Sequence, residues 1–107
     1  MGSVLGNAMN SLAATYSDLG RGQDALVTHE KTLEFRRRVL PKNHPDLGIS
    51  YYNISVSYSQ VGGLIRAIEM AREALRIFQA SLPPSHHHVQ DASQHLLQLE
   101  HAAARRV

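Results

Sequence analysis

The chain lacks cysteine and tryptophan, and only 6% of its 107 residues are aromatic. Without cysteine, neither a disulfide framework nor a thiolate metal site can form. No apolar run approaches the roughly 20 residues that span a bilayer. The formal net charge of +2 is too small to indicate nucleic acid or an anionic membrane as a partner. The sequence therefore predicts a cytoplasmic protein whose core is aliphatic and rich in alanine.

The most informative feature is an internal repeat with an offset of 42 residues. Residues 16–20 read Tyr-Ser-Asp-Leu-Gly, and residues 58–62 read Tyr-Ser-Gln-Val-Gly. The same offset pairs further identical residues: Ala25 with Ala67, Leu33 with Leu75, Leu40 with Leu82, Pro41 with Pro83, and His44 with His86. This ordered recurrence indicates stacked helical units, in which each unit buries the apolar surface of the next.

Apolar residues spaced three and four apart predict five helices. Their expected ranges are 4–19, 23–40, 44–61, 64–82 and 86–105, with glycine turns at 20–22 and 62–63 and proline breaks at 41 and 83–84. Asn43 and Ser85 are the expected N-cap residues of the third and fifth helices. Residues 1–3 read as a cloning remnant, which leaves one domain over 4–105. That domain divides into repeat one (4–43), repeat two (44–85) and 86–105, a partial third repeat or capping helix.

The same spacing assigns a packed face to each helix. On the third helix this face is expected to hold Leu47, Tyr51, Ile54, Ser55, Tyr58 and Val61. The apolar positions of the fourth are Ile65, Ala67, Ile68, Ala71, Ala74, Leu75, Phe78 and Leu82. Ion pairs are expected on the solvated sides between Glu34 and Arg38, Glu69 and Arg72, and Glu73 and Arg76. His29, on the inner side of the second helix, is expected to be packed and neutral.

The recurring positions resemble the tetratricopeptide repeat. They are Leu12, Ala13, Tyr16, Gly20 and Ala25 in the first copy, and Ile54, Ser55, Tyr58, Gly62 and Ala67 in the second. The 42-residue length and the Asn-His-Pro-Asp linker at 43–46 are similar to the kinesin light chain and nephrocystin-like type. Residues 85–88, Ser-His-His-His, keep one of those four linker residues. The resemblance implies a right-handed superhelical α-solenoid of antiparallel helix pairs, about two and a half repeats long.

A concave groove lined by the first helix of each pair is the expected binding surface. The candidate groove residues are Asn10, Ser17, Tyr52, Asn53, Val56, Gln60, Gln94, His95 and Gln98. The resemblance implies that Asn10 and Asn53 hydrogen-bond an extended peptide backbone, since an amide offers both donor and acceptor. The alternative is that these residues are ordinary solvated side chains. Ala14 and Val56 stand where chaperone-binding members have asparagine, which argues against clamping of a terminal carboxylate.

Two charged clusters are expected to be surface features. Residues 36–38 are three arginines, interpreted as a solvated convex face, with an acidic-peptide or phosphate contact as the alternative. The three histidines at 86–88 are interpreted as a drifted linker without metal, because consecutive helical residues diverge by about 100°. A surface site of His88, Asp91 and His95 is the alternative. No catalytic triad order, phosphate loop or paired carboxylate is readable, so neither an enzyme nor a cofactor is expected.

These observations favour a scaffold that binds a protein or peptide partner in the groove. The main alternative is a module that self-associates into a homo-oligomer through exposed repeat ends. A metal- or pH-responsive element built on the histidines is the third hypothesis.

Overall fold

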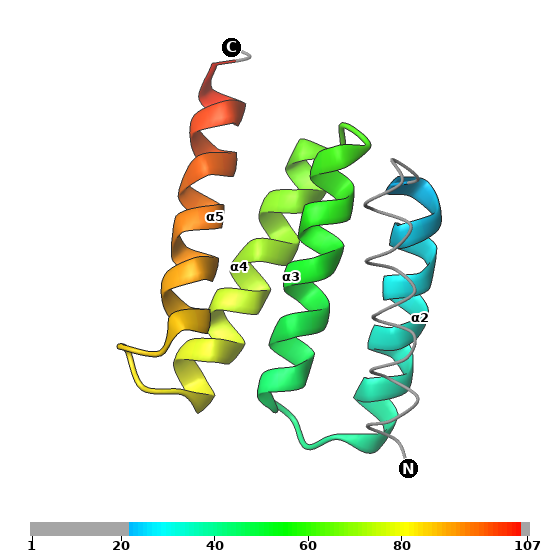
Figure 1. Ribbon diagram of the computed structural model, residues 1–107, viewed down its shortest axis with the longest axis vertical. Coiled ribbons are helices and arrows are strands. Elements are labelled where there is room, and N and C mark those ends of the chain that lie inside the picture. The colour runs from blue at the N-terminus through cyan, green and yellow to red at the C-terminus, as the bar shows by residue number, and fades with distance from the viewer. Residues whose placement is uncertain (1–21, 106–107) are drawn as a thin grey trace.

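The computed structural model describes residues 22–105, which form four helices and no strand. These are α2 (Gly22–Val39), α3 (Pro45–Gln60), α4 (Leu64–Ser81) and α5 (His87–Ala104). Successive helices run in opposite directions, and each packs mainly on its neighbours in sequence (Figure 1). The all-α prediction is therefore confirmed. The helix expected over 4–19, which would carry Leu12, Ala13 and Tyr16, lies outside the described residues, as does Gly20 of the turn after it, so the number of five helices stays a prediction.

Histidines cap both helices that follow a proline linker. His44 Nδ1 accepts a hydrogen bond from the Asp46 amide at 3.0 Å, and His86 Nδ1 accepts one from the His88 amide at 3.0 Å. The prediction that Asn43 and Ser85 cap these helices was therefore wrong. Asn43 adopts the left-handed region, at φ 67°, so the turn is made there and the next residue becomes the extended N-cap. The 42-residue match between the two histidines thus records a shared capping role.

The turn between α3 and α4 forms where the sequence predicts it. Gly62 has a φ of +86°. A residue with a Cβ atom would adopt this conformation only at a cost in free energy. A Cβ atom on Gly63 would lie 3.0 Å from the Tyr58 ring. Val61 and Ile65, which flank this turn, are 41% and 75% exposed, so their predicted burial was wrong. Val61 follows the last residue of α3, and Ile65 lies in the first turn of α4, where the packed faces end.

The core between α3, α4 and α5 is built from alanines around one aromatic ring. Ala67, Ala71, Ala74 and Ala92 are fully buried, and Phe78 is 2% exposed. Phe78 belongs to a cluster with Ala74, Val89 and Ala92, while Tyr58 packs against the cluster of Ala67, Ala71 and Leu99. Small side chains let the helices approach closely, as expected for Ala67. The closest approach is at Gly48, where an added Cβ atom would lie 2.6 Å from the Phe78 ring.

The contact between α2 and α3 includes a buried arginine. Arg36 is 4% exposed, and its guanidinium donates to the Asp46 carbonyl at 3.1 Å and to Ser50 Oγ at 3.0 Å. The interpretation of residues 36–38 as a solvated face was therefore wrong for Arg36, although Arg37 and Arg38 are exposed. The spacing of Ala25, His29, Thr32 and Arg36, which are all buried, explains the difference. These residues share one face of α2, and that face is packed.

The exposed ion pairs follow the predictions in part. Glu34 pairs with Arg38, and Glu73 pairs with Arg76 at 2.6 Å, as expected. The predicted pair of Glu69 with Arg72 was wrong. Glu69 pairs with Arg66 at 2.9 Å, and Arg72 pairs with Glu100 at 3.2 Å, which links α4 to α5. Exposed pairs of this kind contribute only about 0–1 kcal/mol each, so the fold depends on the packed faces.

His29 makes the stability of the fold sensitive to acid. Burial, and then the charge of Arg36, lowers the pKa of His29 from its usual 6.5 to about 4. In the unfolded chain His29 is therefore protonated near pH 6.5, whereas in the folded chain it is protonated only near pH 4. The contribution of neutral His29 to the free energy of unfolding is complete above pH 6.5. It is lost as the pH falls from 6.5 to about 4. The expected loss from this one group is at most roughly 3 kcal/mol.

Urea unfolding of the wild-type protein and of His29→Met, at several pH values between 7 and 4, measures this effect. All other residues are the same in both proteins, so the difference between the two pH profiles isolates His29. We expect a flatter profile for the variant. Parallel profiles would contradict the assignment of a neutral, buried imidazole.

Candidate functional site

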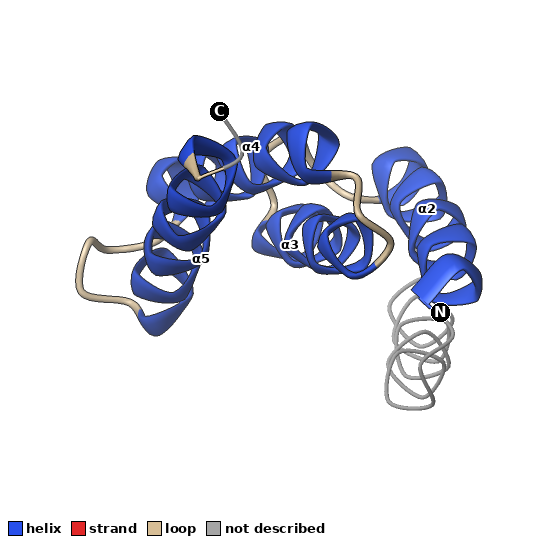
Figure 2. Ribbon diagram, turned by 90° about the horizontal axis from the view of Figure 1, so that it is seen from above, coloured by secondary structure: helices blue, strands red, loops and turns tan. Residues whose placement is uncertain are grey.

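Two hollows lie side by side along α3 and α5, which stand on the same side of α4 (Figure 2). The first has a volume of about 240 Å³ and is lined by Ile49, Tyr52, Asn53, Phe78, His87, His88 and Asp91. The second has a volume of about 210 Å³ and is lined by Tyr52, Asp91, Gln94, His95 and Gln98. Because Tyr52 and Asp91 line both hollows, the hollows are adjacent, and we call the two together the α3–α5 groove.

The structure brings together part of the predicted groove set. The predicted residues that line the α3–α5 groove are Tyr52, Asn53, Gln94, His95 and Gln98. Val56 is half-buried and Gln60 is exposed, and neither lines these two hollows. Asn10 and Ser17 lie outside the described residues. The lining residues outside that candidate set are Ile49, Phe78, His87, His88 and Asp91. His87 and His88 lie on the first turn of α5.

His95 is held in the groove wall by a hydrogen bond that fixes its tautomer. Ser55 Oγ donates to the Ala67 carbonyl at 2.6 Å and lies 3.0 Å from His95 Nε2. A hydroxyl has one proton, so Ser55 must accept from His95, and Nε2 therefore carries the hydrogen. Burial lowers the pKa of His95, which favours the neutral ring. One small side chain thus connects α3, α4 and α5.

Tyr52 completes this wall. Its ring lies 4.9 Å from the His95 ring, measured between centroids, with a tilt of 48°. Burial, and then the charge of Asp91, raises the pKa of Tyr52, so the phenol keeps its proton at neutral pH. Tyr52 is consequently a neutral side chain at the junction of the two hollows.

The groove carries acidic rather than basic charge. Asp91 is the only Asp, Glu, Lys or Arg among the residues that line the two hollows. The amides of Asn53, Gln94 and Gln98 supply both hydrogen-bond donors and acceptors. Neither a lysine nor an arginine lines the two hollows.

The contact of Ser55 with His95 resembles a nucleophile and its base, but it cannot perform that chemistry. Ser55 is fully buried, so no substrate carbonyl can reach its hydroxyl. Its proton is donated to the Ala67 carbonyl rather than to the imidazole. The geometry required of an activated serine is therefore absent at this pair.

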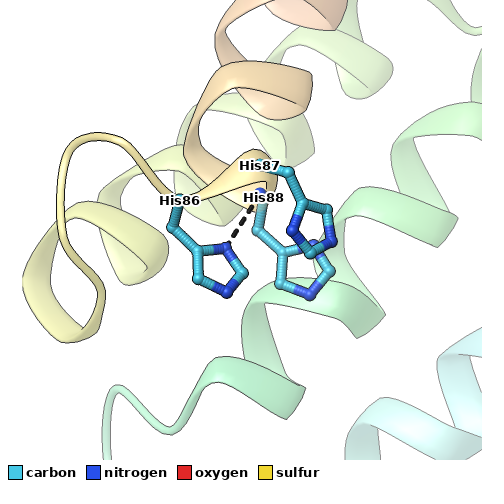
Figure 3. A group of neighbouring side chains, drawn as sticks. All are labelled: His86, His87 and His88. Carbon is cyan, nitrogen blue, oxygen red and sulfur yellow. Dashed lines mark hydrogen bonds between the residues drawn. The ribbon is translucent and has the colours of Figure 1, made fainter.

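The three histidines at the start of α5 lie together, contrary to the sequence argument (Figure 3). Their ring centroids are 4.2 to 4.8 Å apart. The prediction that they diverge was wrong: His86 precedes the helix with extended backbone, at φ −65° and ψ 138°, and the rings of His87 and His88 lie 4.2 Å apart although both residues are helical. The helical angle of about 100° per residue therefore does not apply between His86 and His87. The alternative set of His88, Asp91 and His95 is not among the groups of converging ligand atoms in residues 22–105, where His86, His87 and His88 form the group found.

Comparison with known proteins identifies the family. The family model described as Tetratricopeptide repeat matches residues 4–80. The chain belongs to the tetratricopeptide repeat (TPR) family. TPR repeats generally mediate protein–protein interactions and form non-enzymatic scaffolds. None of the helices formed by residues 22–105 is long and apolar enough to cross a membrane.

Solved structures support the same type of repeat. A crystal structure of nearly identical TPR-like repeats, assigned to a kinesin light chain of Podosopora anserina, superimposes with a TM-score of 0.87 at 21% identity. The match covers 98% of this chain and 49% of that one. A variant of the same protein gives a TM-score of 0.83 at 20% identity, covering 92% and 47%. This TPR chain therefore spans about half the length of these relatives. No protein of curated function matches it.

Proposed function

We propose that this TPR chain is a cytoplasmic interaction scaffold that binds an extended peptide segment of a partner protein in the α3–α5 groove. The observation that carries the proposal is that the two hollows are adjacent and share Tyr52 and Asp91. Neighbouring hollows of this kind suit successive side chains of one peptide. In this proposal, residues 4–19 form the preceding helix of a right-handed superhelix of about two and a half repeats.

The two hollows suit different peptide side chains. Phe78 and Ile49 give the first hollow apolar walls, so it favours an apolar side chain. The amides of Gln94 and Gln98 line the second hollow and can bond the peptide backbone. Asp91, at the boundary, favours a lysine or arginine next to the apolar residue. An exposed ion pair is worth only about 0.2–1 kcal/mol, so the expected preference for basic over acidic peptides is a few-fold.

Amide substitutions test this proposal. A peptide with an adjoining apolar and basic residue is first selected from a synthetic peptide array by the purified chain. Asn53→Ala and Gln94→Ala should each weaken its binding about two- to tenfold, since a lost hydrogen bond costs about 0.5–1.5 kcal/mol. Isothermal titration calorimetry measures the affinities, and circular dichroism confirms unchanged helix content.

Gln90→Ala is the matched control, because Gln90 is exposed on the same helix as Gln94 and lines neither hollow. It should bind like the wild-type protein. Wild-type affinity in both groove variants would show that the peptide binds elsewhere.

Self-association through a repeat end has less support from the described residues. On α5, Leu97 is the only large apolar side chain that is strongly exposed, at 54%. One exposed leucine is ordinary on the surface of a monomer. The peptide-binding proposal is therefore the one that the structure favours.

A further inference from the structure

We propose that His86, His87 and His88 form a binding site for a divalent transition-metal ion of the Zn²⁺ or Ni²⁺ class. One ligand nitrogen from each residue can be chosen so that all three lie within 4.8 Å of one another. Among residues 22–105, this is the only such group of three histidine, cysteine or carboxylate side chains. Imidazole is a preferred ligand for these ions, and two of the three histidines, His87 and His88, also line the first hollow of the groove.

The backbone at the α4–α5 linker brings the three rings together. The His86 amide donates to the Pro83 carbonyl at 2.9 Å, which closes a turn before the helix. His86 is then extended, whereas His87 and His88 are already helical. The ring of His88 stacks on Phe78, with centroids 5.0 Å apart and planes at 19°. Figure 3 shows His86 beside the other two rings, on the same side of the start of α5.

The cap hydrogen bond limits how His86 can bind a metal. Its Nδ1 accepts from the His88 amide, so the neutral ring has its hydrogen on Nε2. A neutral imidazole has only one nitrogen with a free lone pair. His86 cannot therefore ligate a metal and cap the helix simultaneously. Metal binding by all three histidines requires that His86 releases the His88 amide.

Nearby carboxylates offset the unfavourable position of a cation at a helix N-terminus. Burial and the neighbouring His87 and His86 lower the pKa of His88, whereas Asp91 and Asp46 act in the opposite direction. Asp91 lines the first hollow together with His87 and His88. Asp46 belongs to the first turn of α3. Two carboxylates from different helices therefore act electrostatically on His88, and water would fill the remaining coordination positions of the ion.

Calorimetric titration of the untagged full chain with ZnCl₂, repeated with NiCl₂, tests the site. We expect one saturable event of one ion per chain. His87→Ala and His88→Ala should each weaken it at least about tenfold, the order of effect known for disturbed metal sites. His86→Asn should weaken it similarly while retaining a residue that caps helices well. Amide hydrogen exchange at His88 should accelerate when the metal binds, because the cap bond is released.

Two controls separate this site from unspecific binding. His101→Ala removes an exposed histidine near the other end of α5, and His44→Asn changes the equivalent cap at α3. Both should bind metal like the wild-type protein. The proposal is overturned by the absence of saturable binding, by equal affinity in all variants, or by wild-type affinity in His86→Asn. If His88→Ala loses helix content through its contact with Phe78, His87→Ala and His86→Asn still decide the outcome.

Discussion

Replacing Phe78 with alanine is expected to lower the free energy of unfolding by about 3–5 kcal/mol. Phe78 is 2% exposed and packs with Ala74, Val89 and Ala92, where three helices meet. Its alanine neighbours have no longer side chain with which to fill the resulting cavity, so relaxation recovers little of the loss. Urea unfolding followed by circular dichroism measures the change.

Phe35→Ala is the matched control, because Phe35 is only partly buried on α2 and its deletion should cost less. An equal loss in the two variants would contradict the central role of Phe78.

Gly48→Ala examines the same contact from α3, because its Cβ atom would lie 2.6 Å from the Phe78 ring. Alanine is normally the better helix residue, so a destabilisation of about 1–3 kcal/mol would report overpacking. Combining Gly48→Ala with Phe78→Leu should recover part of that loss.

Arg36→Met is expected to destabilise the protein by about 3 kcal/mol. The substitution removes the donors for the Asp46 carbonyl and Ser50 Oγ, and Ser50 is fully buried. These acceptors would lose a charged partner without gaining water. The same variant should raise the pKa of His29, because the charge of Arg36 helps to lower it. Urea unfolding measures the first effect, and NMR titration of the imidazole measures the second.

Arg37→Met provides the control for Arg36→Met. Arg37 is the adjacent residue and is exposed, so its loss should change the stability by no more than about 0.5 kcal/mol. Ser50→Ala removes one acceptor but leaves the guanidinium bonded to the Asp46 carbonyl, and should therefore cost less than Arg36→Met. Equal stability of the Arg36 and Arg37 variants would contradict the buried position of Arg36.

The sequence predicts the helices and their turns because those depend on periodic, local signals. Apolar spacing, the glycines at 62–63 and the prolines at 41 and 83–84 place α2 to α5 within a residue or two of their observed ends. The N-caps could not be predicted from residue preference. Asn43 adopts the left-handed conformation, so the N-cap of α3 is the next residue, His44. That choice depends on backbone geometry that a preference scale does not contain.

Side-chain partners were harder to predict than helices. Arg36 was missed because three consecutive arginines suggest a charged surface, although its spacing from His29 and Thr32 places it on the packed face. His95 was expected in the groove, but its bond to Ser55 joins residues 40 positions apart. A local sequence pattern cannot predict a contact between residues so far apart in the chain. The convergence of residues 86–88 likewise depends on where the helix begins, which the sequence placed one residue too early.

Each helix packs mainly on its neighbours in sequence, and this arrangement affects how fast the chain folds. Because most contacts join segments that are close in the chain, few long loops must close before native contacts form. Such topologies typically fold within microseconds to milliseconds. Under tension applied at the two termini, the same arrangement would let outer helices peel away in succession, each exposing the next. The protein would then unfold under force in several small steps rather than in one cooperative event.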